Sequence, residues 1–243
     1  MKNLKHLLAL AATTAFIGAL PAAEPEKKPE WVTSAGLNFT LTSGNTDTVL
    51  LGADINSVKK TKENEFLLGA GGGYGENQGR KNVEFGRAFG QWNRLFSERL
   101  YGYVRGEALH DGIADLRYRF TGTAGAGYYL IKEARTSLAV EVGPGYVYEK
   151  LTSGVNSFAT IRFAERFEHK LSDTARIWQS AEFLPSLSDF TSDYVINAEL
   201  GIESALTKKL SLRSVLTDTY DSTPSAGRKS NDLKLTTGLA YKF

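Results

Sequence analysis

The last eleven residues of the chain, LKLTTGLAYKF, alternate between two kinds of side chain. One set is uncharged and mostly apolar and ends in Leu239, Tyr241 and Phe243, whereas the other set is small or polar. A repeat of two residues predicts a β-strand with one apolar and one polar face. Chain ends usually fray, so an apolar strand that continues to the final residue requires something apolar to cover that face.

The start of the chain predicts export. The stretch MKNLKHLLALAATTAFIGALPAA places basic residues first, then an apolar run, then small residues. This order is typical of a secretory signal peptide, here residues 1–23, with cleavage after Ala22 or Ala23. An uncleaved anchor is the alternative, although the apolar run is short for a spanning helix. We expect residues 24–30 to form a short polar periplasmic lead-in and residues 31–243 to form one domain.

Composition narrows the class of protein. The chain has no cysteine, which excludes disulfides and a lipid-attachment cysteine and, in an exported protein, favours a bacterial source. A formal net charge of +2 is too small to imply a nucleic-acid partner. The 24 glycines, 11 tyrosines and 13 phenylalanines suit a membrane barrel, in which polar and apolar residues alternate. Composition alone would also fit a secreted β-sandwich.

Alternating segments and turn signals follow one another from residue 31 to the end, without a linker. We expect twelve strands, each near the roughly 9–11 residues that a tilted strand needs to cross a bilayer. Their expected spans are 31–42, 47–59, 65–75, 82–95, 100–110, 115–130, 136–149, 156–168, 174–185, 193–204, 210–220 and 231–243. The predicted fold is all-β, a closed antiparallel transmembrane β-barrel of about twelve strands.

The connections and the two chain ends point to the Gram-negative outer membrane. The even-numbered connections are compact and charged, and both chain ends lie on their side, as in outer-membrane barrels. We expect the last strand to close against the first, WVTSAGLNFTL, with lipid on the apolar faces. The expected partners are outer-membrane lipid and lipopolysaccharide, together with the barrel-assembly machinery, which would engage the C-terminal strand. The outward residues predicted for the first strand are Trp31, Ala35, Leu37, Phe39 and Leu41.

One strand contains a proline. Pro144 lies within EVGPGYVYE, where a strand would be paired on both sides. Proline removes a hydrogen-bond donor from the ladder and is usually confined to edges or bulges. We therefore expect a bulge or kink at Gly143–Gly145.

The faces predicted to point inward carry charges of both signs. The candidate lumen-lining residues are Arg105, Glu107, Arg117, Arg119, Glu141, Arg162, Arg166, Glu199, Glu203 and Arg213, with Glu168, Arg176 and Glu182 beside them. Eight-stranded barrels fill their interior and barrels of 16 to 18 strands leave a channel, so twelve strands fit either a plug of ion pairs or a narrow pore. Inward glycines at 69, 71 and 73 would make room for long side chains or for solute. We expect a structural role or a narrow passive channel for small solutes.

Catalysis has little support in the sequence. Only His110 and His169 follow the predicted signal peptide, and no serine has a nucleophile context. The acidic stretches SLSDFTSD and TDTYDS lack the spacing of a calcium loop, so we expect no metal, no cofactor and no enzymatic activity. The alternatives are a lipid-modifying enzyme, for which His110 is the obvious candidate, and a surface binding or adhesion module, which the fairly short outer loops disfavour.

The stretch GLNFTLTSGNTDTVLLGADINSV carries a family resemblance. A strand, the turn Ser43-Gly44-Asn45-Thr46 and Asp47 opening the next strand resemble the salt-induced outer-membrane proteins, also called domain of unknown function 481. The likeness covers residues 31–243, including LLGAGGGYGE and the aromatic C-terminus. It implies an outer-membrane β-barrel with a link to salt or osmotic response, and it transfers no catalytic residue. Gly44 and Asn45 tolerate positive φ, so a tight hairpin explains the turn; ligand recognition by Asn45 or Asp47 is the alternative.

Overall fold

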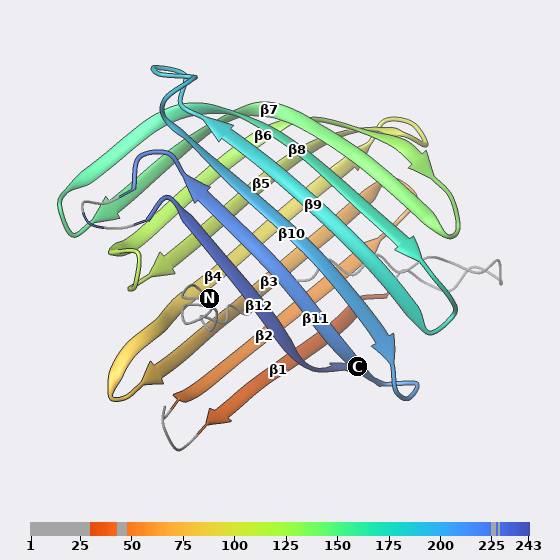
Figure 1. Ribbon diagram of the computed structural model, residues 1–243. Helices are drawn as coiled ribbons and strands as arrows, with labels where there is room; N and C mark the ends of the chain where they lie inside the picture. Colours follow the sequence, from red (N-terminus) through yellow and green to blue (C-terminus); the bar gives the residue numbers. More distant parts are fainter. Residues whose placement is uncertain (1–29, 43–47, 225–226, 228) are drawn as a thin grey trace.

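The computed structural model describes residues 30–42, 48–224, 227 and 229–243. Within these ranges the chain forms twelve strands (Figure 1): β1 (Val32–Thr42), β2 (Thr48–Lys60), β3 (Asn64–Asn77), β4 (Arg80–Leu95), β5 (Leu100–Asp111), β6 (Leu116–Lys132), β7 (Thr136–Leu151), β8 (Val155–Lys170), β9 (Ala175–Pro185), β10 (Tyr194–Ala205), β11 (Leu210–Asp221) and β12 (Asn231–Lys242). Every predicted strand is present with nearly its predicted bounds. The predicted signal peptide lies outside the described residues. In the described ranges no helix is long and apolar enough to span a membrane.

The sheet closes on itself, as predicted. Each strand pairs antiparallel with its neighbours in the chain, and β12 pairs with β1 (Figure 1). The register of this seam runs from Ser34 opposite Lys242 to Leu37 opposite Leu239. The Phe243 amide adds a hydrogen bond of 3.1 Å to the Thr33 carbonyl. A closed barrel leaves no edge strand, so the C-terminal strand is held on both sides up to its end.

The outer wall is apolar and the interior is polar, which reverses the arrangement of a water-soluble protein. Leu37 is 65 % exposed and Leu235 is 52 % exposed on the outer wall, whereas Asn93 and Arg213 are buried inside. Hydrocarbon is the environment in which such a wall is stable, and a closed barrel satisfies its backbone groups there. The predicted outward positions Trp31, Ala35 and Leu37 lie on this wall. The side chains of Phe39 and Leu41 lie outside the described part.

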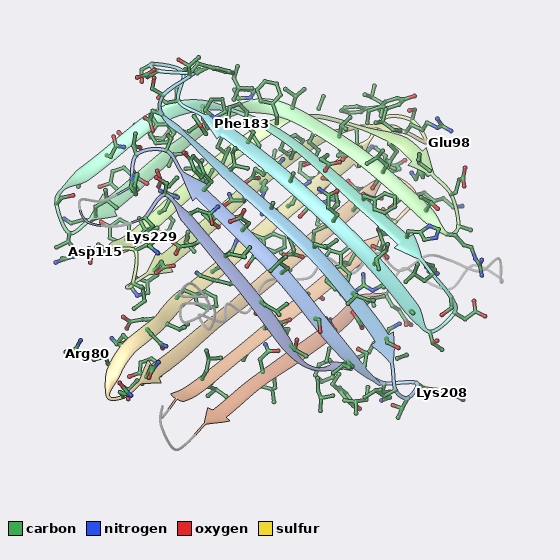
Figure 2. All side chains as sticks on the ribbon, in the orientation of Figure 1. Arg80, Glu98, Asp115, Phe183, Lys208 and Lys229 are labelled. Carbon is green, nitrogen blue, oxygen red and sulfur yellow. The ribbon has the colours of Figure 1, made fainter. Side chains whose placement is uncertain are left out.

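Charged side chains mark the two ends of the barrel. We call the end that carries the connections 61–63, 96–99, 133–135, 171–174 and 206–209 the turn end. The other end is the loop end, and it carries the connections 186–193 and 222–230. Figure 2 shows Glu98 and Lys208 at the turn end and Arg80, Asp115 and Lys229 at the loop end. The apolar wall is therefore bounded by charge on both sides, as a bilayer requires.

The bulge predicted at Gly143–Gly145 is wrong. The pairing of β6 with β7 keeps one register across this point, from Thr123 opposite Gly145 to Ala126 opposite Val142. No β-bridge joins Ala124 or Gly125 to β7 between these two pairs. The strands are nevertheless close, because a Cβ at Gly143 would lie 2.1 Å from the Ala124 carbonyl oxygen. The missing N–H of Pro144 is thus accommodated by a close approach of two glycine-containing strands, without an extra residue in either.

An aromatic layer lies inside the barrel near the turn end. Tyr101 and Tyr103 of β5 and Tyr129 of β6 are buried and pack with Ala139 of β7. The rings of Tyr101 and Tyr129 are 5.2 Å apart between centroids. Glycines on neighbouring strands make room for such rings, because a Cβ at Gly127 would overlap the Tyr101 ring. Near the turn end the interior therefore contains aromatic as well as charged side chains.

Candidate functional site in the barrel lumen

The predicted lumen residues come together inside the barrel, with one exception. Position parity and contacts place the following on the inner face: Arg105, Glu107, Arg119, Glu141, Arg162, Arg166, Glu199, Glu203 and Arg213. Arg117 is exposed at a register shift between Leu116 and Tyr118, where one residue of β6 has no partner on β7. This extra residue moves Arg117 out of the inward row. A bulge of this kind cannot be read from a period of two.

Of the two other predicted motifs, one lies outside the described residues and one lies within them. The turn Ser43–Asp47 lies outside the described residues. Leu239, Tyr241 and Phe243 are on the outer wall, and the rings of Tyr241 and Phe243 meet edge to face at 5.3 Å. The apolar side chains of the C-terminal strand therefore point away from the lumen.

Glu141 of β7 is the centre of a buried network near the turn end. Its Oε2 accepts a hydrogen bond of 2.6 Å from Arg162 Nη1 of β8. Its Oε1 accepts bonds of 2.8 Å from Gln91 Nε2 of β4 and from the Tyr101 hydroxyl of β5. Arg166 Nη2 lies 3.6 Å from the same oxygen. Because charged hydrogen bonds satisfy both carboxylate oxygens, this carboxylate can remain ionised away from water.

Arg213 of β11 forms a second centre beside the seam. Its Nη1 lies 3.0 Å from Asp54 Oδ2 on β2, and its Nη2 donates to Ser34 Oγ on β1 at 3.2 Å. Its Nε lies 3.3 Å from Glu203 Oε2 on β10. Strands β12 and β1 stand between β11 and β2. Arg213 therefore ties the two sides of the seam together from inside the barrel.

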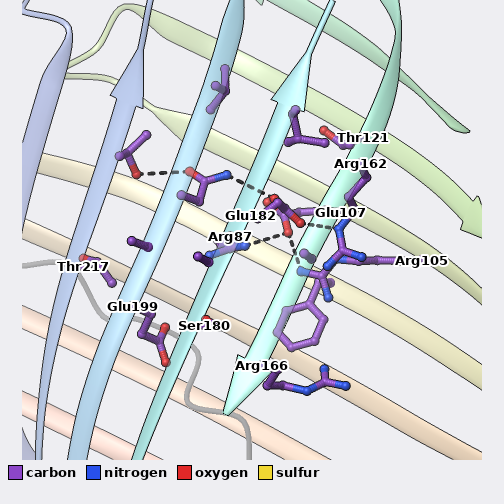
Figure 3. A pocket seen from close by; sticks show the side chains of 18 of the residues that line it. Arg87, Arg105, Glu107, Thr121, Arg162, Arg166, Ser180, Glu182, Glu199 and Thr217 are labelled. Carbon is purple, nitrogen blue, oxygen red and sulfur yellow. Dashed lines mark hydrogen bonds and ion pairs between the residues drawn. The ribbon is translucent and has the colours of Figure 1, made fainter. Parts of the chain in front are cut away.

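A three-residue charge cluster lies on the wall of β4 and β5. Glu107 Oε2 accepts hydrogen bonds of 2.7 Å from both Arg87 Nη2 and Arg105 Nη2 (Figure 3). Arg105 Nη1 also reaches Gln91 Oε1 at 3.4 Å, which connects this cluster to Glu141. Two guanidinium groups share one carboxylate here, so the cluster carries a net positive charge.

Two ion pairs cross the lumen at the loop end. Arg119 of β6 lies 2.6 Å from Glu149 of β7 and 3.2 Å from Asp221 of β11. Lys234 of β12 lies 3.3 Å from Asp111 of β5. In the closed order of twelve strands, β6 and β11 are five positions apart, as are β5 and β12, so each pair lies nearly opposite across the barrel. These pairs therefore connect opposite walls and narrow the passage.

A cavity of about 180 Å³ lies between these networks, and Glu199 of β10 faces it. Glu199 Oε1 accepts a bond of 2.6 Å from Trp178 Nε1, and Ser180 and Thr217 are its register partners on β9 and β11. Figure 3 shows Glu199, Ser180, Thr217 and Arg87 around the pocket. Within the described residues Glu199 forms no ion pair. This carboxylate is therefore one group in the cavity wall that a solute could contact.

Several interior residues escaped sequence reasoning. Asp54 and Arg87 each lie among small or apolar neighbours in the sequence, and Glu65 follows the charged turn KKTKEN, so their strands did not look charged on one face. Glu65 accepts bonds from Asn93 at 3.1 Å and from the Tyr129 hydroxyl at 2.7 Å. Every second residue of a strand points to the same face, so counting alternate positions along each strand would have placed these three residues inside the barrel. Gly69 makes room for neighbouring side chains, as predicted, because Phe89 and Asn56 occupy the space where its Cβ would lie.

The described residues contain no cluster of His, Cys, Asp and Glu that could hold a metal ion. His110 is exposed near the loop end, and its Nδ1 lies 2.8 Å from the Arg117 carbonyl oxygen. His169 Nδ1 lies 2.9 Å from Thr136 Oγ1 near the turn end. The two histidines therefore occupy opposite ends of the barrel.

Residues 34–243 match the model of a family described as "Protein of unknown function, DUF481". The chain belongs to this family. The resemblance read from TSGNTDT is thereby confirmed, and the association with salt stays a prediction. No curated protein matches the chain.

Solved structures with a similar fold are outer-membrane barrels. The translocator domain of the autotransporter NalP from Neisseria meningitidis shares 15% identity, with 88% of this chain and 87% of that chain covered and a TM-score of 0.46. The KdgM porin shares 9%, covering 88% and 99% with a TM-score of 0.45. An anion-selective porin from Comamonas acidovorans shares 10%, covering 88% and 98% with a TM-score of 0.41.

Proposed function

We propose that this protein is a narrow passive channel of the Gram-negative outer membrane that admits only ions and small polar solutes. The observation that carries the proposal is the pair of ion bridges that cross the lumen, Arg119 to Asp221 and Lys234 to Asp111. A barrel of twelve strands is intermediate in width between small barrels with a filled interior and large barrels with an open pore. The two ion pairs narrow the lumen of this barrel further. Water and small ions can pass around such side chains, whereas larger solutes cannot.

The interior charge supports weak selectivity. The cluster of Arg87, Glu107 and Arg105 carries excess positive charge, whereas pairs such as Arg162 with Glu141 place both signs of charge in the lumen. Such a mixture attracts both signs of ion, and rings of one sign are what give strong selectivity. The expected current is therefore small and only weakly selective between cations and anions.

The position in the membrane belongs to the same proposal. Lipid and lipopolysaccharide surround the apolar wall, and the barrel-assembly machinery engages the C-terminal strand that ends in Phe243. The protein carries no catalytic activity in this scheme. A link to salt or osmotic adaptation would follow from a passive pathway for ions across the envelope.

Single-channel recording of the refolded protein in planar bilayers tests the proposal. The native protein should give a small, steady conductance. Asp221→Ala should increase the conductance several-fold, because it removes one ion pair that crosses the lumen. Glu141→Ala should also change the conductance, because it removes the central carboxylate of the network near the turn end. Arg94→Ala is the matched control, since Arg94 pairs with Glu63 outside the lumen. A flat trace from the native protein and every variant, with insertion verified, would contradict the proposal.

A further inference from the structure

A polar pair lies on the outer wall, where lipid is expected. Glu165 of β8 is the register partner of Val140, and Gln179 of β9 is the register partner of Leu200. Val140 and Leu200 are both exposed on the outer wall, so Glu165 and Gln179 point outward as well. Gln179 Nε2 donates a hydrogen bond of 2.5 Å to Glu165 Oε1.

The surroundings of this pair are apolar in every direction along the wall. A groove of about 660 Å³ runs over β5 to β10 beside Glu165, and its lining includes Val140, Val142, Phe163, Ala181, Phe183 and Ile196. Figure 2 shows Phe183 on this outer surface. Toward the turn end, Phe167 and Ile177 are the next outward residues on the same strands. The carboxylate is therefore well inside the apolar band and away from both charged ends.

Lipid chains cannot satisfy such a pair. The single hydrogen bond leaves one N–H of Gln179 and one carboxylate oxygen of Glu165 without a bond from any described residue. An ionisable side chain in hydrocarbon is unfavourable and usually marks a functional contact. Lipid headgroups lie at the interfaces, so their amines do not reach this depth. A protein surface that presents polar groups at the same depth can supply the missing bonds.

We propose that the face of β8 and β9 centred on Glu165 and Gln179 binds a second copy of this chain within the membrane. The pair is self-complementary, because a two-fold axis brings the donor of each Gln179 to the acceptor of the other copy's Glu165. An isologous interface requires this relation, in which one patch meets itself. Each carboxylate then lies between two amides, which keeps the two negative charges apart. The apolar groove side chains pack around the polar centre.

Cysteine cross-linking tests the contact directly, because the chain has no cysteine of its own. Ala181 is the register partner of Glu165 on β9, so Ala181→Cys places a thiol at the proposed interface. Ala53→Cys places one on the outer wall of β2, on the other side of the barrel. With a short bismaleimide in native membranes, Ala181→Cys should give a product of twice the monomer mass and Ala53→Cys should not. Equal cross-linking of the two variants would overturn the proposal.

The polar pair itself is tested by a double variant. Glu165→Leu with Gln179→Leu should weaken dimer formation at least tenfold, measured by subunit photobleaching in vesicles over a range of protein-to-lipid ratios. Ser214→Leu with Thr237→Leu is the control, because these hydroxyls form a 3.0 Å hydrogen bond on the outer wall of β11 and β12. Heat-dependent migration on a gel verifies that each variant is a folded barrel. A native protein that stays monomeric at every ratio, or a cross-linked product with a different protein, would overturn the proposal.

Discussion

At the scale of single residues, Arg213 shows how an interior charge can hold the barrel closed. It is 5 % exposed and contacts Asp54, Ser34 and Glu203 on three other strands. Arg213→Ala would leave the buried carboxylate of Asp54 without its ion-pair partner, whereas Glu203 would keep Arg176. Breaking a buried ion pair destabilises a protein by about 3–5 kcal/mol. We expect a loss of that order in the free energy of unfolding, measured by urea titration in lipid vesicles.

Arg94→Ala is the comparison for that measurement. Arg94 pairs with Glu63 at 2.6 Å, but both side chains are exposed at the turn end. Exposed pairs contribute about 0–1 kcal/mol. Equal losses from the two arginine variants would show that the interior network is solvated and that Arg213 does not stabilise the seam.

At the scale of elements, the backbones of β6 and β7 approach each other closely beside Pro144. A Cβ at Gly125 would lie 2.1 Å from the Val142 carbonyl oxygen, and a backbone atom cannot move aside as a side chain can. Gly125→Ala must push the strands apart, and overpacking of this kind destabilises a protein by about 1–3 kcal/mol. The midpoint of urea unfolding should fall accordingly.

The same strand supplies the control for this prediction. Gly122 has nothing within 4 Å of the position of its Cβ. Gly122→Ala should change the free energy of unfolding by less than about 0.5 kcal/mol. A loss equal to that of Gly125→Ala would mean that the effect comes from glycine in general and not from the approach of the two strands beside Pro144.

At the scale of the whole molecule, the seam should be the first part of the wall to open. The register pairs described between β1 and β12 run from Ser34–Lys242 to Leu37–Leu239, whereas β7 and β8 pair from Thr136–His169 to Lys150–Val155. Regions with fewer backbone bonds open at lower free energy. Hydrogen exchange in vesicles should therefore be faster in β12 than in β7. Arg213→Ala should accelerate exchange at the seam and leave β7 unchanged; uniform acceleration would contradict this view of the seam.

The sequence by itself determined the architecture. A period of two, turn residues between strands and a final strand ending in Tyr241 and Phe243 predict twelve strands with one face toward lipid. These signals are local, because each strand carries its own alternation. The inward positions of Glu141 and Arg162 followed from the same parity.

Tertiary structure decided what the local pattern does not contain. The shift that exposes Arg117, the continuous register at Pro144 and the pairing of Asp54 with Arg213 depend on which strands meet and how closely. Partners far apart in the chain, such as Arg119 and Asp221, become neighbours only when the sheet closes. The physical reason is that alternation fixes the side of the sheet on which a residue lies, whereas closure and register fix the residue that it faces across the lumen.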